Sequence, residues 1–216
     1  AFYASASLLD HPHLRGTPVI IGGGGRSVVL SATYEARAFG VTSAMPMTRA
    51  KRLCPQATVI RPDHDRYAAI SAAVMATFRS VTDLVEPLSL DEAFLDVAPA
   101  VRRLGSPATI GQWVRDTIAD EQGITCSVGV AATKFVAKLA SGLAKPDGLL
   151  VVPRADVLTF LHQLPVGALW GVGDRTEEAL HRLGLMTIGD IAHTPVDTLR
   201  RALGDASGTH LHTLAW

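Results

Sequence analysis

The chain has 216 residues, of which 48% are hydrophobic and 19% charged, a length between those of one and two typical domains. No apolar run approaches about 18 residues and the N-terminal segment lacks a signal-peptide pattern, so we expect no membrane association. Twenty basic and 20 acidic residues give a net charge of zero, which argues mildly against nucleic acid and, taken alone, favours a metabolic enzyme.

In chain order, the first residues, AFYASAS, are expected to form the end of a strand that runs into a helix. Residues 17–21 and 26–31 then predict a hairpin joined through Gly22 to Gly25. Helices are expected over 33–40, 45–53 and 63–81, a strand over 58–61, and a second hairpin over 84–88 and 93–97. The long helix begins after the capping residue Asp63, and its apolar face repeats at helical spacing through Tyr67, Ile70, Val74, Met75 and Phe78.

Ser106-Pro107 predicts the start of a helix that runs to about residue 121. Beyond it we expect a strand over 124–131, a helix over 133–144, a strand over 149–152, and helices over 154–162, 174–183, 187–193 and 195–203. The strands stop near Pro153, which suggests a domain boundary there. The pattern predicts an α+β fold followed by an all-helical segment.

The strongest chemical signal is SLDEAFLD, residues 89–96, which places the adjacent carboxylates Asp91 and Glu92 at the edge of an apolar hairpin. Burying these carboxylates unpaired would be costly, so we expect something positive to meet them, either an Arg/Lys cluster or a divalent metal. Oxygen ligands suit Mg²⁺, which proteins often hold through one or two carboxylates plus a substrate phosphate. An ion pair or plain solvent exposure remains open.

Tyr34 and Arg37 lie one helical turn apart in YEARAFGV, residues 34–41. A guanidinium beside a hydroxyl suits a phosphate, although Arg37 could instead pair with a local glutamate. Lys145 sits in the rigid turn AKPDG, residues 144–148, from which it could reach a phosphate. The alternative is a lysine that only complements a helix dipole.

Gly171 and Gly173 lie between two predicted helices in LWGVG, residues 169–173. This pattern favours a helix-hairpin-helix, whose backbone N–H groups can bind a phosphate without reading sequence. An ordinary helix hairpin remains possible. The tract Gly22 to Gly25 lacks the spacing of a dinucleotide or nucleotide-phosphate loop, so we reject such a site there.

The order of these motifs is more specific than any one of them. AFYAS, YEARAFGV, SLDEAFLD, SVGVAATKFVAKLAS with AKPDG, and LWGVG with LGLMTIGDI occur in the order found in Y-family translesion DNA polymerases. The chain resembles that family over nearly its whole length, and its DinB-type branch most closely.

The resemblance implies a right-hand polymerase core with a mixed, mostly antiparallel palm sheet plus helices. The palm would comprise residues 1–10 and 63–152, the small fingers 11–62, and the all-helical thumb 153–216. The implied reaction is error-prone nucleotidyl transfer from deoxynucleoside triphosphates, with two Mg²⁺ ions roughly 3.5–4 Å apart. Small fingers and an open site would explain tolerance of damaged templates.

The resemblance also implies residue roles. Asp91 and Glu92 match metal-binding carboxylates, with Glu92 nearest the primer 3′-hydroxyl. The nucleotide-binding residues would be Tyr3, Ser31, Tyr34, Arg37 and Lys145. Tyr3 matches the steric gate against a ribose 2′-hydroxyl, and Phe2 offers backbone near the metal-bound triphosphate. Val28 and Leu30 would roof the nascent base pair, and Gly171 and Gly173 would hold the DNA backbone.

Two departures from the family pattern matter. The family's first motif carries an Asp just before the AFYAS segment, and a little finger domain follows the thumb; neither is in this sequence. We therefore expect a fragment with weak or no activity in isolation. The implied partners are primer–template DNA, deoxynucleoside triphosphates and, through the missing C-terminal region, a sliding clamp.

We expect a monomer in the bacterial cytoplasm, in keeping with Cys54 and Cys126, which form no metal-binding spacing and indicate reduced thiols. Two other functions are considered. One is a catalytically inert relative that binds DNA within a mutagenesis complex. The other is an unrelated metal-dependent metabolic enzyme.

Overall fold

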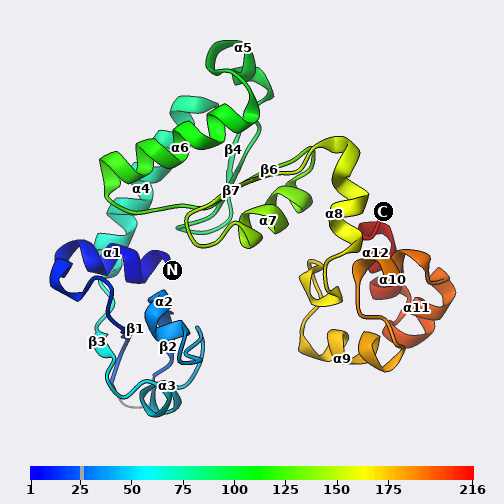
Figure 1. Cartoon of the computed structure of the whole chain (residues 1–216), viewed down its shortest axis with the longest axis horizontal. Coiled ribbons are helices and arrows are strands. Elements are labelled where there is room, and N and C mark those ends of the chain that lie inside the picture. The colour runs from blue at the N-terminus through cyan, green and yellow to red at the C-terminus, as the bar shows by residue number, and fades with distance from the viewer. Residues whose placement is uncertain (25–26) are drawn as a thin grey trace. The chain divides into compact units, whose positions relative to one another are not determined.

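The computed structural model describes residues 1–24 and 27–216, which form two compact units, Ala1–Cys126 and Ser127–Trp216 (Figure 1). Gly25 and Arg26, where the predicted hairpin turn meets its second strand, lie outside the described residues. We call Ala1–Cys126 unit 1 and Ser127–Trp216 unit 2.

Unit 1 contains a three-stranded sheet in the order β2-β1-β3. Its strands are β1 (Val19–Gly22), β2 (Val29–Ala32) and β3 (Thr58–Ile60). The β1–β2 pair is antiparallel, as the hairpin prediction requires, and β1–β3 is parallel. Alternate residues of β1 enter two different cores, because Val19 and Ile21 face one cluster and Ile20 faces the other.

The helices of unit 1 are α1 (Phe2–Asp10), α2 (Tyr34–Arg37), α3 (Met47–Leu53), α4 (His64–Val81), α5 (Val101–Leu104) and α6 (Pro107–Gln122). Both predicted caps are confirmed. Asp63 accepts the N–H of Arg66 at 3.0 Å and starts α4, while Ser106 accepts the N–H of Thr109 at 3.1 Å and starts α6. The apolar faces of α4 and α6 pack together, side by side in Figure 1.

A two-stranded antiparallel hairpin, β4 (Val85–Pro87) and β5 (Ala93–Leu95), completes unit 1. The main core of this unit combines residues from α1, β1, α4 and α6. Its members are Ala4, Ala6, Val19, Ile21, Tyr67, Ile70, Val74, Val81, Ala100, Ile110, Val114, Ile118 and Ile124. The helix α4 lies against this core and contacts β4, so it is the support on which the hairpin rests.

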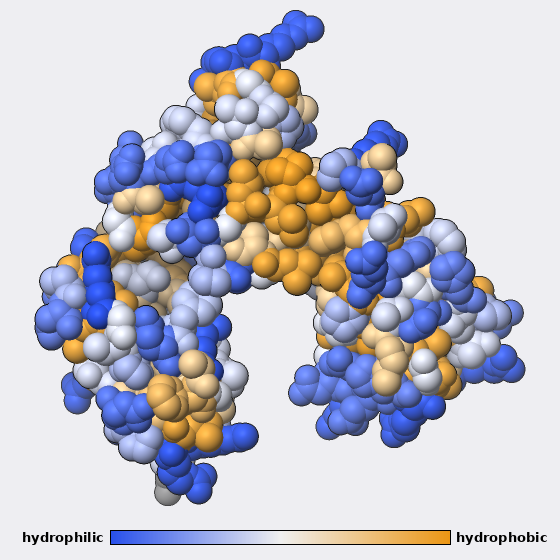
Figure 2. Space-filling view, in the orientation of Figure 1, coloured by the Kyte–Doolittle hydropathy of each residue, from blue (hydrophilic) through white to orange (hydrophobic). Residues whose placement is uncertain are grey.

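Unit 2 opens with the parallel strands β6 (Val128–Val130) and β7 (Leu149–Val151), connected by α7 (Lys134–Leu143). Gly129 of β6 lies directly beneath α7, where a Cβ would stand 2.0 Å from the Ala137 carbonyl oxygen. The helices that follow are α8 (Val157–His162), α9 (Asp174–Arg182), α10 (Ile188–His193), α11 (Val196–Leu203) and α12 (Asp205–Leu214). Hydrophobic side chains gather over α7 and its strands in Figure 2.

One core extends across the predicted palm–thumb boundary at Pro153. It joins Val136 and Ala140 of α7 to Leu161, Leu180 and other residues of the later helices. The structure divides into its two units at Cys126, ahead of that boundary. The assignment of palm, fingers and thumb stays a prediction.

The α+β class agrees with the expectation. Several element ends differ, and the helices α5 and α12 were not expected. The helix expected over 33–40 stops at Arg37, because Gly40 adopts φ +84° and its N–H bonds to the Arg37 carbonyl. The strand expected over 124–131 shortens to Val128–Val130. Both cysteines carry thiols rather than a disulfide. Among the described residues, none of the helices has the length and hydrophobicity needed to cross a bilayer.

Candidate active site

The Asp91–Glu92 pair lies on a tight turn at the end of the β4–β5 hairpin. The N–H groups of Leu88 and Ser89 donate to the Glu92 carbonyl oxygen at 2.8 and 3.3 Å and close the turn. The Ser89 hydroxyl donates to Asp91 Oδ1 at 2.8 Å and accepts from the Asp91 N–H at 3.3 Å. Both acidic residues are exposed, so the turn presents two neighbouring carboxylates to solvent.

Solvent exposure in unit 1 therefore avoids much of the free-energy cost that burial of these two charges would carry. Over residues 1–24 and 27–216, no group of three or more His, Cys, Asp or Glu side chains is arranged to hold a metal ion. Two adjacent carboxylates still fit Mg²⁺, because this ion is commonly held by one or two carboxylates together with substrate phosphates. The pair fits a cation that is shared with a phosphate ligand.

One stripe of α4 supports both the acidic turn and the predicted steric gate. Ser71 donates its hydroxyl to the Leu90 carbonyl oxygen at 2.5 Å, next to Asp91 in the chain. Tyr67, one helical turn earlier on the same face, packs its ring against that of Tyr3, with the ring centroids 4.7 Å apart. The positions of Tyr3 and of the turn are thus both set by this face of α4.

Tyr3 belongs to an aromatic cluster at the start of α1. Its ring centroid lies 5.5 Å from that of Phe2, and the fully buried Tyr67 contacts both rings. The Tyr67 hydroxyl shares a 2.7 Å hydrogen bond with the buried hydroxyl of Ser7, and this bond restrains the orientation of the Tyr67 ring. Tyr3 and Phe2 are half-buried, so each keeps part of its surface for contact with a ligand.

Tyr34 and Arg37 form one unit on the short helix α2. The helix is capped by Thr33, whose Oγ1 accepts the N–H of Ala36 at 3.4 Å. Arg37 donates its Nε–H to the Ala32 carbonyl oxygen at 3.0 Å, and its guanidinium carbon lies 5.6 Å from the centroid of the Tyr34 ring. Both residues are exposed, which suits a cation and a hydroxyl that meet a phosphate together.

The predicted roof residues lie along the second strand of the hairpin. Val28 is 52% exposed and forms a bridge with Pro46, whereas Leu30 is half-buried against the main core. Ser31, expected to bind nucleotide, is only 4% exposed and pairs with Ile21, so its side chain is directed into the fold in this structure.

Lys145 lies in unit 2, where the Ser127 hydroxyl closes the turn that carries it. That hydroxyl donates to the Ala144 carbonyl oxygen at 3.2 Å and accepts the Gly148 N–H at 3.4 Å. The Lys145–Pro146 peptide is cis, and Lys145 itself is exposed. The turn is therefore pinned at its base and presents an exposed cation.

Gly171 and Gly173 also lie in unit 2, in an exposed loop before α9. Gly171 has φ +94°, which favours glycine, and Gly173 is the N-cap of α9. A Cβ at either glycine would meet nothing within 4 Å, so the backbone there is open to an approaching group. Trp170 precedes this loop, and the Lys138 ammonium lies 5.5 Å from its ring centroid.

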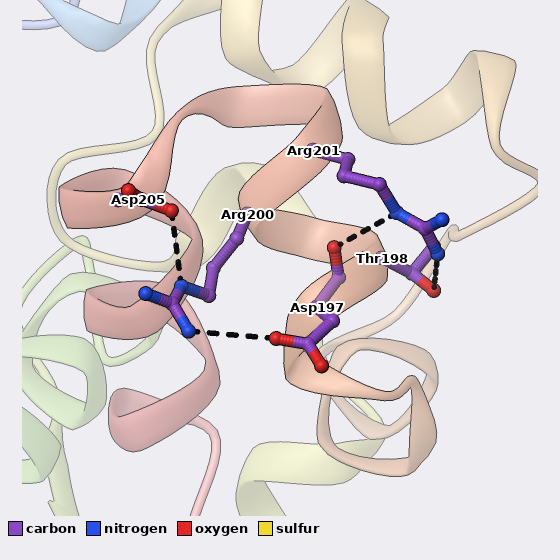
Figure 3. Close-up of polar contacts among 5 residues, drawn as sticks. All are labelled: Asp197, Thr198, Arg200, Arg201 and Asp205. Atoms are coloured by element: carbon purple, nitrogen blue, oxygen red, sulfur yellow. Dashed lines mark hydrogen bonds and ion pairs between the residues drawn. The ribbon is translucent and has the colours of Figure 1, made fainter.

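An arginine cluster at the junction of α11 and α12 was not singled out by the sequence motifs (Figure 3). Arg200 lies between Asp205 at 3.1 Å and Asp197 at 3.4 Å, and Arg201 bonds to the backbone of Asp197 and the side chain of Thr198. The two ion pairs of Arg200 are exposed, and such pairs contribute about 0–1 kcal/mol each. The pair with Asp205 joins α11 to α12.

Ser7, Tyr67 and Ser71 are site residues that the motifs missed. The available signal was polar groups on the apolar stripes of predicted helices, where a buried hydroxyl needs a partner. The partner of Ser71 lies 19 residues away, which sequence spacing does not reveal.

Comparison with known proteins identifies the class of protein that this chain resembles. The chain is 48% identical over 217 residues to a DNA polymerase IV of Exiguobacterium sibiricum, covering 100% of this chain and 60% of the relative. The crystal structure of DinB from Sulfolobus solfataricus superposes with a TM-score of 0.92 at 30% identity, over 99% of this chain and 64% of that one. An insertion ternary complex of Dbh DNA polymerase gives 0.91 at 30% identity, with the same coverage.

The chain therefore has the fold of the Y-family DNA polymerase core, and the resemblance indicated by its motifs is confirmed. The model of the impB/mucB/samB family matches residues 1–142, and the helix-hairpin-helix motif of the same group matches residues 154–185. The chain belongs to the impB/mucB/samB family. It spans about 60% of the length of the curated relative named above.

Proposed function

We propose that this chain carries the nucleotidyl-transfer site of an error-prone DNA polymerase that copies past damaged bases. The observation that carries the proposal is the exposed Asp91–Glu92 pair, held on a hydrogen-bonded turn. The Tyr34–Arg37 unit in the same half of the chain supports it, because a polymerase must bind a triphosphate as well as a metal.

In the proposed reaction the primer 3′-hydroxyl releases its proton to solvent and its oxygen bonds to the α-phosphorus of the incoming nucleotide. The bond between the α-phosphorus and the bridging oxygen of the β-phosphate breaks, and pyrophosphate leaves with that oxygen. Asp91 and Glu92 would hold Mg²⁺, which lowers the barrier by stabilising charge on the attacking and leaving oxygens. Glu92 would lie nearest the primer 3′-hydroxyl. The Ser89 hydroxyl, which donates to Asp91 Oδ1, keeps that carboxylate oriented.

The remaining residues bind and select the nucleotide. Tyr34 and Arg37 grip the triphosphate, and Lys145 neutralises part of its charge. Tyr3, braced by the buried Tyr67, excludes a ribose 2′-hydroxyl by contact with its ring. Phe2 offers backbone beside the triphosphate.

The proposed macromolecular ligand is primer–template DNA. Val28, with half its surface exposed, and the half-buried Leu30 cover the nascent base pair from the fingers. The open backbone at Gly171 and Gly173 holds a DNA phosphate by N–H groups, without reading sequence. The palm, fingers and thumb keep the boundaries expected from the sequence, and a monomer that binds a sliding clamp through a further region completes the proposal.

The test is primer extension by the full-length protein on primed DNA with Mg²⁺ and single deoxynucleotides. We expect distributive, error-prone synthesis that Asp91→Ala and Glu92→Ala each lower by about 100-fold or more. Asp83→Ala, which removes another exposed carboxylate near the hairpin, serves as the control and retains activity. Retained DNA binding without extension by the parent protein would replace the proposal with an inert DNA-binding relative.

A further inference from the structure

Ser71 is a buried polar residue in the middle of α4, and its hydroxyl forms a hydrogen bond to a residue outside that helix. The residue is 5% exposed, and its Oγ donates to the Leu90 carbonyl oxygen at 2.5 Å. Leu90 directly precedes Asp91, so the hydrogen bond ends on the peptide group that leads into the acidic pair.

A serine or threonine inside a helix commonly bonds to the carbonyl four residues earlier. Thr77, two turns along the same helix, does this with Ala73 at 3.4 Å. Ser71 instead reaches a turn 19 residues away, which makes it a tether between the core and the hairpin end.

The other hydrogen bonds described for this turn remain within the turn itself. They run from Leu88 and Ser89 to Glu92, and between Ser89 and Asp91. They define the shape of the turn. The Ser71 bond connects the turn to α4, which is anchored in the main core through Tyr67, Ile70 and Val74.

We propose that Ser71 is a positioning residue that holds the Asp91–Glu92 pair in the geometry needed to bind a divalent cation. The inference rests on the proposed polymerase function. Metal-ligating carboxylates depend on the groups behind them, whose loss typically costs about 10–100-fold in metal affinity or activity. A displacement of about 1 Å is enough to cost about 100-fold in rate.

The experiment compares Ser71→Ala with Thr77→Val in the full-length protein. Both changes remove a buried hydroxyl from α4, but only the first cuts the tether to the turn. Mn²⁺ binding is measured by loss of the free-ion signal in electron paramagnetic resonance. Primer extension gives kcat and the nucleotide KM, and urea unfolding measures stability.

For Ser71→Ala we expect Mn²⁺ affinity and kcat each to fall about tenfold with little change in the nucleotide KM. Thr77→Val keeps the parent values of both. Ser71→Cys has a side chain of similar volume but a weaker hydrogen-bond donor, so its Mn²⁺ affinity and kcat should lie between those of the parent and of Ser71→Ala. This variant replaces Ser71→Ala in the test if the alanine variant does not fold.

The inference is overturned if Ser71→Ala keeps the parental Mn²⁺ affinity and kcat while Asp91→Ala is inactive. The same criterion applies to Ser71→Cys where that variant replaces Ser71→Ala. The inference is equally overturned if Thr77→Val reproduces the losses, because helix stability would then explain them. An active Asp91→Ala variant would instead overturn the proposed function itself.

Discussion

Gly129 is the position where a single added methyl group is expected to separate two elements of unit 2. A Cβ on this residue would stand 2.0 Å from the Ala137 carbonyl oxygen and 2.4 Å from the Ser141 nitrogen, both in the backbone of α7. To restore an ordinary 3.4 Å contact with that oxygen, the helix must move by about 1.4 Å. Because α7 contributes Val136 and Ala140 to the core, we place Gly129→Ala near 3 kcal/mol, the upper end of the about 1–3 kcal/mol range for overpacking.

The assay is equilibrium urea unfolding followed by tryptophan fluorescence, since Trp170 and Trp216 both lie in unit 2. With a slope of about 2 kcal/mol/M, the midpoint of Gly129→Ala should fall by about 1.5 M. Gly142→Ala is the matched control, because a Cβ there meets nothing within 4 Å, and it should stabilise α7 by about 0.5–1 kcal/mol. A Gly129→Ala midpoint at or above the parent value would show that α7 accommodates the added methyl group.

Two further predictions concern charged groups. Arg37→Lys removes the Nε–H hydrogen bond to the Ala32 carbonyl and the planar guanidinium, so the nucleotide KM in primer extension should rise about tenfold with kcat nearly unchanged. Arg52→Lys, at another exposed arginine, should keep the parent KM. A KM for Arg37→Lys equal to that of the parent would contradict the role of Arg37. Hydrogen bonds from the backbone N–H groups of Thr187 and Met186 lower the pKa of Asp190. Its stabilising effect is therefore present above its unfolded pKa of about 3.9 and lost as pH falls through the lower folded value. Asp190→Asn should unfold at lower urea than the parent at pH 7, with the gap closing below about pH 4; a gap that persists there would contradict this.

Local signals in the sequence were sufficient for most elements. The caps Asp63 and Ser106 and the helical spacing of apolar residues located α4 and α6 to within a residue or two. The motifs also identified the family, because their order along the chain is independent of how the elements pack. Asp91 and Glu92 stood out as adjacent acids in an otherwise apolar hairpin.

What the sequence left undetermined depends on contacts between distant segments. The hydrogen bond from Ser71 to Leu90 and the ring contact between Tyr67 and Tyr3 join residues far apart in the chain, so no local pattern predicts them. Burial of Ser31 follows from two-sided packing of the β1–β2 pair, which strand alternation alone does not specify. The continuous core on both sides of Pro153 likewise required the packed helices.

We propose that the Asp91–Glu92 turn performs metal-dependent nucleotidyl transfer. The most direct measurement is single-turnover incorporation of one deoxynucleotide into primed DNA by the full-length protein, compared between Asp91→Ala and Asp83→Ala. For Asp91→Ala we expect a rate constant lowered by about 100-fold or more with primed-DNA binding unchanged, and for Asp83→Ala the parent rate. An Asp91→Ala rate equal to that of the parent would contradict it.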